Sequence, residues 1–333
     1  LYVARVRYLY SMKKIGILTS GGDAPGMNAC IRAAVRTAVL NDIKVLGFYR
    51  GYEGLIENDS KELTRYDVRN IIHRGGTFLK TARSSDFKTL DGRLRASKVI
   101  RSHGLDGMIV IGGDGSFTGA NLLSIEHDIP VIVCPGTIDN DLFGTDYTIG
   151  YQTAVDTALD AVDNIRDTAA SHNRLFFVEV MGRDAGLIAL RTGIAAGAEG
   201  ILIPETPTDL NQLVNYLKTD FKKKRRSGII IVAEGDSEGG AYEVAKKVQE
   251  QFPNWETKVT VLGHIQRGGK PNGFDRILAS RMGHGALLAL KQGRNREMIG
   301  IKAGKLVHIP IEKAIKHNVA ISQYLLDLVK ALS

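Results

Sequence analysis

The sequence predicts an α/β protein with mainly parallel sheets that helices cover on both faces. Two observations predict this class. Apolar runs of five or six residues alternate along the chain with stretches whose apolar residues recur at helical spacing. Gly and Pro bound these runs, as is typical of strands buried on both faces of a sheet. The 333 residues are also enough for two cores rather than one.

The expected elements follow in a regular order. An apolar run opens each of the segments 13–28, 106–121 and 129–141 and predicts a buried strand. The other elements expected in the first half are a helix over 27–40, a strand over 44–49, a short helix over 67–72, a helix over 96–103 and a helix that starts near Ser116. The second half predicts helices over 151–169, 186–197 and 210–224 and strands over 174–182, 200–205 and 228–235.

Two sets of polar strand ends indicate two lobes. One set follows the first three buried strands, and the other contains Met181, Arg183 and Glu234. We therefore expect two Rossmann-like lobes with the active site in the cleft between them. The expected division is an N-terminal extension at 1–11 outside the fold, a larger lobe at 12–150 plus 266–316, and a smaller lobe at 151–265 plus 317–333.

Composition indicates a protein that binds anions. The formal net charge is +8, and it is +6 without residues 1–11, whose charged side chains are Arg5 and Arg7 alone; this excess suits small anionic ligands as well as nucleic acid. No apolar stretch approaches the roughly 20 residues of a membrane span. Cys30 and Cys134 have no metal or disulfide spacing and are expected in the core of a cytoplasmic protein. The aromatic residues are few and are mostly within expected strands, so we expect neither a nucleic-acid nor a membrane partner.

Three glycine-rich turns predict a phosphate site. Each follows a buried strand, and ligands of open α/β sheets bind at such strand ends. The glycines that would let the backbone approach an anion are Gly21, Gly22, Gly113 and Gly115. Asp114 and Asp139 would add negative charge beside bound phosphate. That arrangement requires a cation between them, and Mg²⁺ fits it.

The common nucleotide motifs are absent. The chain contains no G-x-x-x-x-G-K-[ST], which excludes a P-loop. Thr118 stands where a G-x-G-x-x-G fingerprint needs its third glycine.

Six segments carry a family resemblance. They are TSGGDAPGMN, GGTFLKTARSSDF, IGGDGSFTGA, PGTIDND, SHNRLFFVEVMGRDAG and VLGHIQRGG, and they cover nearly the whole chain from Met12 in this order. Together they resemble the phosphofructokinase family in its bacterial, ATP-dependent form. The resemblance implies Mg²⁺-dependent phosphoryl transfer from ATP to the 1-hydroxyl of fructose 6-phosphate, giving fructose 1,6-bisphosphate and ADP in the committed step of glycolysis. It also implies a regulated homotetramer.

The resemblance assigns the catalytic roles. Asp139 would be the general base, Thr137 would hold the hydroxyl or the moving phosphoryl group, and Asp141 would support the geometry. Arg83 and Arg183 would stabilise the transferring group, because a guanidinium matches phosphate oxygens. The implied nucleotide-binding residues of the larger lobe are Gly22, Arg83, Ser84, Gly113, Asp114, Gly115 and Ser116, with Asp114 as the ligand of the catalytic Mg²⁺.

The smaller lobe is implied to bind the sugar phosphate. Glu234 would accept the sugar hydroxyls, while His264 and Arg267 would hold the 6-phosphate. Arg174 and Lys258 match positions that reach across from a neighbouring subunit. The implied substrate-binding residues are Thr137, Ile138, Asp139, Arg174, Met181, Gly182, Arg183, Glu234, Lys258, His264, Ile265, Gln266 and Arg267.

Three further positions bear on the substrate affinity and on the choice of phosphoryl donor. Lys258 stands where the family more usually has Arg, so the charge stays but the planar two-pronged grip is lost. We expect weaker substrate affinity or altered cooperativity. In pyrophosphate-dependent relatives, bulkier or charged residues replace two glycines, and here both positions, Gly115 and Gly136, are glycine. We therefore expect ATP as the donor.

A basic set is expected to form a regulatory site. Arg32 and Arg36 lie four residues apart and so share one helix face. The resemblance implies an effector site for ADP or GDP as activator and phosphoenolpyruvate as inhibitor, in which Glu199 holds a second Mg²⁺. The implied residues are Arg32, Arg36, Arg65, Arg166, Gly197, Ala198, Glu199, Lys223, Arg225, Arg226 and Ser227. The run KKKRR is also typical of a solvated helix end.

Other classes of protein explain less of the sequence. The alternatives are a pyrophosphate-dependent phosphofructokinase and a non-catalytic sugar-phosphate sensor. A sensor gives little reason for Asp139 beside Asp114. A lipid or dinucleotide kinase could use the GGDG loop, but it leaves PGTIDND and HIQRGG unexplained.

Overall fold

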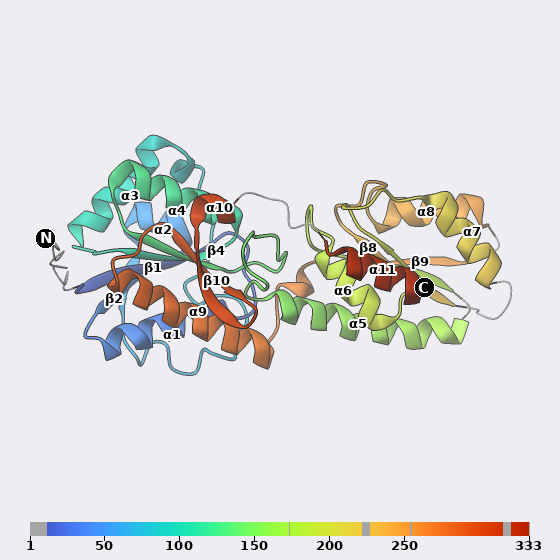
Figure 1. Cartoon of the computed structure of the whole chain (residues 1–333), viewed down its shortest axis with the longest axis horizontal. Coiled ribbons are helices and arrows are strands. Elements are labelled where there is room, and N and C mark those ends of the chain that lie inside the picture. The colour runs from blue at the N-terminus through green and yellow to red at the C-terminus, as the bar shows by residue number, and fades with distance from the viewer. Residues whose placement is uncertain (1–11, 173, 222–226, 254, 316–320, 333) are drawn as a thin grey trace, which may run out of the picture. The chain divides into compact units, whose positions relative to one another are not determined.

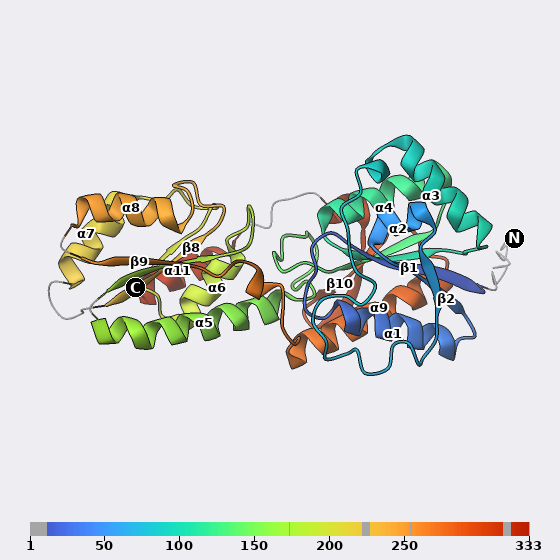
Figure 2. The same cartoon turned by 180° about the vertical axis from the view of Figure 1, so that it is seen from behind.

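The computed structural model describes residues 12–172, 174–221, 227–253, 255–315 and 321–332, so the expected extension at 1–11 lies outside the described residues. The chain divides into two compact units, each with its own sheet (Figures 1 and 2). The first unit falls within Leu1–Gly136, Leu142–Asp146 and Arg276–Lys316. The second falls within Thr137–Asp141, Tyr147–Asp275 and His317–Ser333.

The first unit contains a seven-stranded sheet in the order β11-β10-β5-β4-β1-β2-β3. The strands are β1 (Lys14–Ser20), β2 (Lys44–Phe48), β3 (Ser60–Leu63), β4 (Met108–Gly112), β5 (Val131–Pro135), β10 (Glu297–Lys302) and β11 (Lys305–Pro310). The five inner strands are parallel, and the edge strands β3 and β11 pair antiparallel to their neighbours. The expected mainly parallel sheet is therefore confirmed, with one antiparallel strand at each edge.

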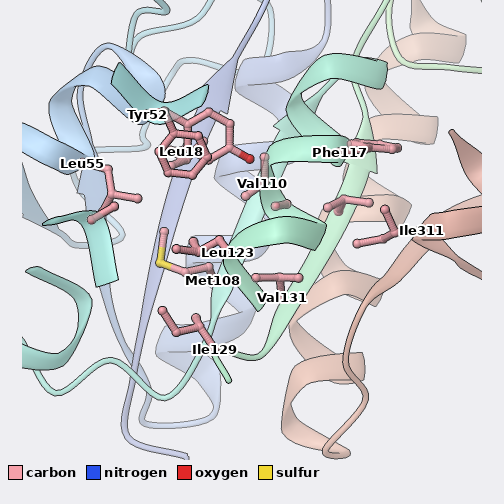
Figure 3. Close-up of a cluster of buried hydrophobic side chains, with 14 of the residues drawn as sticks. Leu18, Tyr52, Leu55, Met108, Val110, Phe117, Leu123, Ile129, Val131 and Ile311 are labelled. Carbon is pink, nitrogen blue, oxygen red and sulfur yellow. The ribbon is translucent and has the colours of Figure 1, made fainter. Parts of the chain in front are cut away.

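Helices cover both faces of this sheet. They are α1 (Met27–Leu40), α2 (Gly51–Glu57), α3 (Leu90–Ser102), α4 (Asp114–His127), α9 (Gly273–Lys291) and α10 (Ile311–Ala314), with the 3₁₀ helix η1 (Asp86–Lys88). In Figure 1, α1 and α9 lie below the sheet, and α2, α3, α4 and α10 lie above it. Figure 3 shows the core on the latter face, where Val110 and Val131 of the sheet pack against Leu123 and Phe117 of α4. All four are fully buried, which explains the near-continuous apolar runs of the sequence.

The second unit has a four-stranded, fully parallel sheet in the order β7-β8-β6-β9. Its elements are α5 (Tyr151–His172), β6 (Leu175–Val180), α6 (Leu187–Ala196), β7 (Gly200–Leu202), α7 (Leu210–Phe221), β8 (Gly228–Ala233), α8 (Ala241–Gln251), β9 (Thr257–Val261), the 3₁₀ helix η2 (Gly263–Gln266) and α11 (Gln323–Leu332). Helices α7 and α8 cover one face, where Phe177, Ile230, Leu217 and Val244 form a second core. Helices α5 and α6 cover the other (Figure 1).

Two expected helices differ in the structure. The helix expected over 67–72 is a series of turns, in which the Asp67 carboxylate accepts hydrogen bonds from the Thr64 amide and hydroxyl. Such side-chain bonds compete with a helix. The helix expected over 96–103 begins earlier, at Leu90, because the Thr89 hydroxyl caps it by accepting from Gly92 N at 3.0 Å. The spacing of apolar residues, on which both predictions were based, contains no information on these side-chain hydrogen bonds to the backbone.

Within the described part of the chain, every helix is too short or too polar to span a membrane.

Candidate functional site

The glycine-rich loops of the first unit leave the sheet side by side. Strands β5, β4 and β1 are parallel neighbours. Their last residues are in register, since Gly112 pairs with both Ser20 and Pro135. The structure therefore brings together the three loops that were expected to bind phosphate, at the carboxyl edge of the sheet.

These loops surround the start of α4. Gly21 has a φ of 86°, and a Cβ on it would lie 3.3 Å from Ser116 Oγ. Gly113 precedes α4 and makes no side-chain cap bond, and Asp114 is the first helical residue. The buried Tyr52 hydroxyl donates to Ser116 O at 2.6 Å and fixes this first turn. A helix N-terminus reached by close backbone is well suited to an anion.

Gly115 and Gly136, which the sequence predicts to select ATP as the donor, have different surroundings. A Cβ on Gly115 would meet no atom within 4 Å, so the space beside it is open. A Cβ on Gly136 would lie 2.9 Å from Met27 Cε and 3.0 Å from Ile111 Cγ2, so this position is already packed. Of the other residues expected to bind the nucleotide, Gly22 and Arg83 are exposed, and Ser84 Oγ accepts a hydrogen bond from Phe87 N at 3.2 Å.

In the second unit, Asp139 has a buried carboxylate, one oxygen of which has no hydrogen-bond partner. Its residue is only 2% exposed, and Asp139 N donates to Thr137 Oγ1 at 3.2 Å. Oδ2 lies 3.6 Å from Arg183 Nε, whereas Oδ1 has no hydrogen-bond partner in the structure. A buried oxygen without a partner is costly unless a ligand supplies one. Oδ1 can therefore accept the proton of a bound hydroxyl.

The surroundings raise the pKa of Asp139. Burial is the largest cause, and the negative charge of Asp141 adds to it. The positive charges of Arg267 and Arg183 and the hydroxyl of Thr137 act in the opposite direction. A carboxylate with a raised pKa and cations nearby is suited to general-base chemistry.

The turn after β6 carries Met181, Gly182 and Arg183. Gly182 has a φ of 149°, and Arg183 has a φ of 54°, so the backbone turns sharply. Glu234, directly after β8, accepts from Arg183 N at 2.7 Å and from Gly182 N at 3.4 Å. Gln266, which is fully buried, accepts from Met181 N at 3.2 Å. Thus the side chains of Glu234 and Gln266 fix the backbone of this turn by accepting hydrogen bonds from its amides.

The η2 segment supplies the remaining residues at this edge. It follows β9, a neighbour of β6, so it starts at the same carboxyl edge. His264 and Ile265 are exposed, and Arg267 is half-buried. Ile138, also predicted to bind substrate, is fully buried.

Arg174 and Lys258 lie at the opposite end of this sheet. Arg174 precedes β6 and Lys258 is the second residue of β9, so both are at the amino ends of their strands. Both bind one carboxylate, since Glu256 lies 2.7 Å from Arg174 Nε and 2.7 Å from Lys258 Nζ. Lys258 and Arg174 together lower the pKa of Glu256 to about 2. Within a single chain, the structure does not bring these two cations to Arg183 or Glu234.

The expected effector residues fall in both units. In the second unit, Arg166 donates to the carbonyls of Ala196 and Gly197 at 2.7 and 3.0 Å and lies 3.7 Å from Glu199. Glu199 is buried and accepts from Ile229 N at 2.7 Å. Ala198 is buried beside it, and Ser227 directly precedes β8.

The first unit holds the other effector arginines. Partial burial and the charge of Arg36 lower the pKa of Arg32. Arg65 donates to Tyr66 Oη at 2.8 Å. Lys223, Arg225 and Arg226 lie outside the described residues.

The sequence missed Glu256 and Thr148. Glu256 pairs with Arg174 and Lys258, the two cations expected to bind the phosphate of a neighbouring subunit's substrate. Its position two residues before Lys258, the spacing of side chains on one face of a strand, was the one feature of the sequence that could have predicted this pairing. Thr148 contacts both sides of the Asp139 turn, but nothing in the sequence distinguishes it from other buried threonines.

The side chains alone do not form a metal cage. In the described residues, no group of three or more His, Cys, Asp or Glu side chains is placed to hold a metal ion. Asp114 is the first residue of α4 and directly follows Gly113. One carboxylate with phosphate oxygens is the arrangement in which Mg²⁺ commonly binds, so the residues present fit a Mg²⁺–nucleotide complex.

Comparison with known proteins agrees with this geometry. The family model described as "Phosphofructokinase" matches residues 14–290. The chain is 52% identical over 323 residues to the ATP-dependent 6-phosphofructokinase 2 of Bacteroides thetaiotaomicron, covering 97% of this chain and 99% of that protein.

Solved structures show the same fold. The phosphofructokinase of Saccharomyces cerevisiae superposes with a TM-score of 0.87 at 36% identity, over 96% of this chain and 46% of that chain. The chain therefore spans about half the length of the yeast protein. A pyrophosphate-dependent phosphofructokinase from Marinobacter aquaeolei superposes with a TM-score of 0.83 over 96% of this chain and 91% of that chain, but at 22% identity, which bears on fold alone.

Proposed function

The chain belongs to the phosphofructokinase family, and on this premise we propose that it transfers the γ-phosphoryl group of ATP to the 1-hydroxyl of D-fructose 6-phosphate. The products are fructose 1,6-bisphosphate and ADP, and the step commits the sugar to glycolysis. The observation that carries the proposal is the buried Asp139 carboxylate, whose Oδ1 lacks a partner and whose pKa is raised.

Asp139 acts as the general base. Its carboxylate takes the proton of the 1-hydroxyl, the sugar oxygen forms a bond to the γ-phosphorus, and the bond from that phosphorus to the β,γ-bridging oxygen breaks as ADP leaves. Thr137 holds the acceptor hydroxyl, and Asp141 keeps the pKa of Asp139 high. Arg183, 3.6 Å from Asp139, stabilises charge on the transferring group together with Arg83.

The first unit binds the nucleotide. The loops at Gly22, Arg83 and Ser84 and the start of α4 from Gly113 to Ser116 hold the phosphates. Asp114 would hold Mg²⁺, which when bound neutralises charge on the phosphate oxygens. The open space beside Gly115 supports ATP as the donor over pyrophosphate.

The second unit binds the sugar phosphate. Met181 to Arg183 and Glu234 contact the sugar, and His264 and Arg267 hold its 6-phosphate. Arg174 and Lys258 lie at the far end of the same sheet, which supports their service to the site of a neighbouring subunit. We therefore propose a homotetramer with active and effector sites shared between subunits.

An effector site completes the proposal. The cluster of Arg166, Gly197 and Glu199 supports a nucleoside diphosphate site, with Glu199 toward Mg²⁺ and with Arg32, Arg36 and Arg65 as further phosphate ligands. ADP or GDP would activate, and phosphoenolpyruvate would inhibit. The free buried thiols Cys30 and Cys134 support a reducing compartment, the cytoplasm.

The test is steady-state formation of fructose 1,6-bisphosphate with Mg²⁺ and either ATP or pyrophosphate. We expect turnover with ATP, and a loss of kcat of about 10²- to 10⁴-fold or more in Asp139→Ser, with little change in either KM. Turnover with pyrophosphate alone would contradict the role of Gly115 and Gly136. Binding of both substrates without turnover would indicate a sensor.

A further inference from the structure

We propose that Thr148 is a positioning residue that clamps the turn carrying Asp139. The proposal rests on the function proposed above, for which Asp139 is the base. Thr148 forms hydrogen bonds with residues on both sides of Asp139.

Thr148 holds the turn with two different groups. Its hydroxyl donates to Thr137 O at 2.6 Å, and its amide donates to Asn140 Oδ1 at 2.7 Å. Thr137 lies two residues before Asp139, and Asn140 follows directly. Thr148 is fully buried, so water does not compete for either bond.

The turn needs such a clamp because its backbone is strained. Asn140 has a φ of 55°, in the left-handed region that is unfavourable for residues other than Gly. Asn tolerates this region better than most residues, and its side chain here also supplies the acceptor for Thr148 N. The strain persists only where surrounding contacts enforce it, and Thr148 supplies two of those contacts.

The clamp is itself anchored. Thr148 lies three residues before the start of α5, and Tyr151 N donates to Thr148 O at 3.3 Å. The fully buried Asp275 accepts from Gly150 N at 2.9 Å and from Thr153 N at 2.8 Å, which fixes the first turn of α5. The buried Asp275 carboxylate therefore holds the start of α5 rigidly. Because Thr148 is bonded to this helix start, its two hydrogen bonds hold the Asp139 turn against a rigid element.

Positioning matters here because Asp139 Oδ1 must meet the acceptor hydroxyl within hydrogen-bond reach. A displacement of about 1 Å can cost on the order of 100-fold in rate. Loss of the clamp should therefore lower kcat while leaving substrate binding by other residues intact.

The experiment compares Thr148→Val, which removes only the hydroxyl at nearly constant volume, with Thr148→Ser, which keeps the hydroxyl. We expect kcat of Thr148→Val to fall by about 10- to 100-fold with KM for both substrates nearly unchanged. Thr148→Ser should retain most of the wild-type kcat. Equal losses in the two variants, or a raised KM at normal kcat, would overturn the proposal.

A second variant tests the other half of the clamp. Asn140→Gly permits the left-handed backbone but removes the acceptor, so kcat should again fall, and this variant serves if Thr148→Val does not fold. Hydrogen exchange gives a readout independent of catalysis, since peptides over 137–141 should exchange faster in both variants. Normal exchange and normal kcat would refute the clamp. An inactive wild type with faster exchange in the variants would refute the proposed function while leaving the clamp standing.

Discussion

At the residue scale, the central feature is a carboxylate whose protonation is set by burial and by neighbouring charges of both signs. Burial and Asp141 raise the pKa of Asp139, while Arg267 and Arg183 lower it. As the proposed general base, Asp139 would work only when it is deprotonated. We therefore expect activity to be lost as the pH falls through a pKa that lies above the ordinary value for an Asp side chain.

Asp141→Asn should move this loss of activity to lower pH. Removing the negative charge of Asp141 takes away one cause of the raised pKa, so Asp139 stays ionised in more acidic solution. The measurement is the acid limb of kcat/KM against pH, which reports groups of the free enzyme. An unchanged acid limb would mean that another group controls it. The matched control is Asp160→Asn, which changes a helical carboxylate of the same unit outside the site.

A second prediction at the residue scale concerns the role of Lys258 in binding the sugar phosphate. Lys258→Arg restores a planar guanidinium, which can grip a phosphate with two parallel hydrogen bonds. We expect tighter saturation by fructose 6-phosphate or altered cooperativity, with little change in the KM for ATP. An identical saturation curve would refute the role of this position. Because Glu256 binds both Lys258 and Arg174, Glu256→Gln should also change sugar-phosphate saturation.

At the scale of elements, the contact of α1 with α9 depends on one glycine. A Cβ on Gly283 would lie 2.2 Å from the carbonyl oxygen of Cys30, so the two helix backbones touch. This contact covers one face of the larger sheet (Figure 2). It explains a glycine inside a helix, where glycine is otherwise unfavourable.

Gly283→Ala should lower the free energy of unfolding by about 1–3 kcal/mol, because the helices must separate to admit the methyl group. The control is Gly273→Ala at the start of the same helix, where a Cβ meets no atom within 4 Å. That change should be neutral or stabilise by up to about 1 kcal/mol. Chemical denaturation of the two variants measures the difference, and equal stabilities would contradict a tight contact between α1 and α9.

At the scale of the whole molecule, two units with separate cores are expected to bind separate substrates. Mg²⁺–ATP should slow hydrogen exchange in the first unit, around 19–23 and 112–118. Fructose 6-phosphate should slow it in the second, around 181–183, 234 and 264–267. Free fructose is the control, since it lacks the 6-phosphate. Failure of Mg²⁺–ATP to protect the segments of the first unit, or of fructose 6-phosphate to protect those of the second, would contradict this assignment of the units.

Much of the fold could be predicted from local pattern. The helix expected over 27–40 matches α1, and the long apolar runs became β4 and β5, because a strand buried on both faces needs apolar residues throughout. The turns over 67–72 were not predicted, because a single Asp67 side chain outweighed a weak helical pattern.

The sequence by itself determined the α/β class and the glycine-rich loops at the strand ends, and it predicted roles for Asp139, Asp114 and the arginines. These features reside in short motifs whose backbone and side-chain requirements are local. Only the tertiary structure decided that Asp139 Oδ1 has no hydrogen-bond partner, that Glu256 pairs with both Arg174 and Lys258, and that Thr148 bonds to Thr137 and Asn140 on either side of Asp139. Burial and hydrogen bonding between residues distant in sequence depend on strand order and packing, which no local pattern contains.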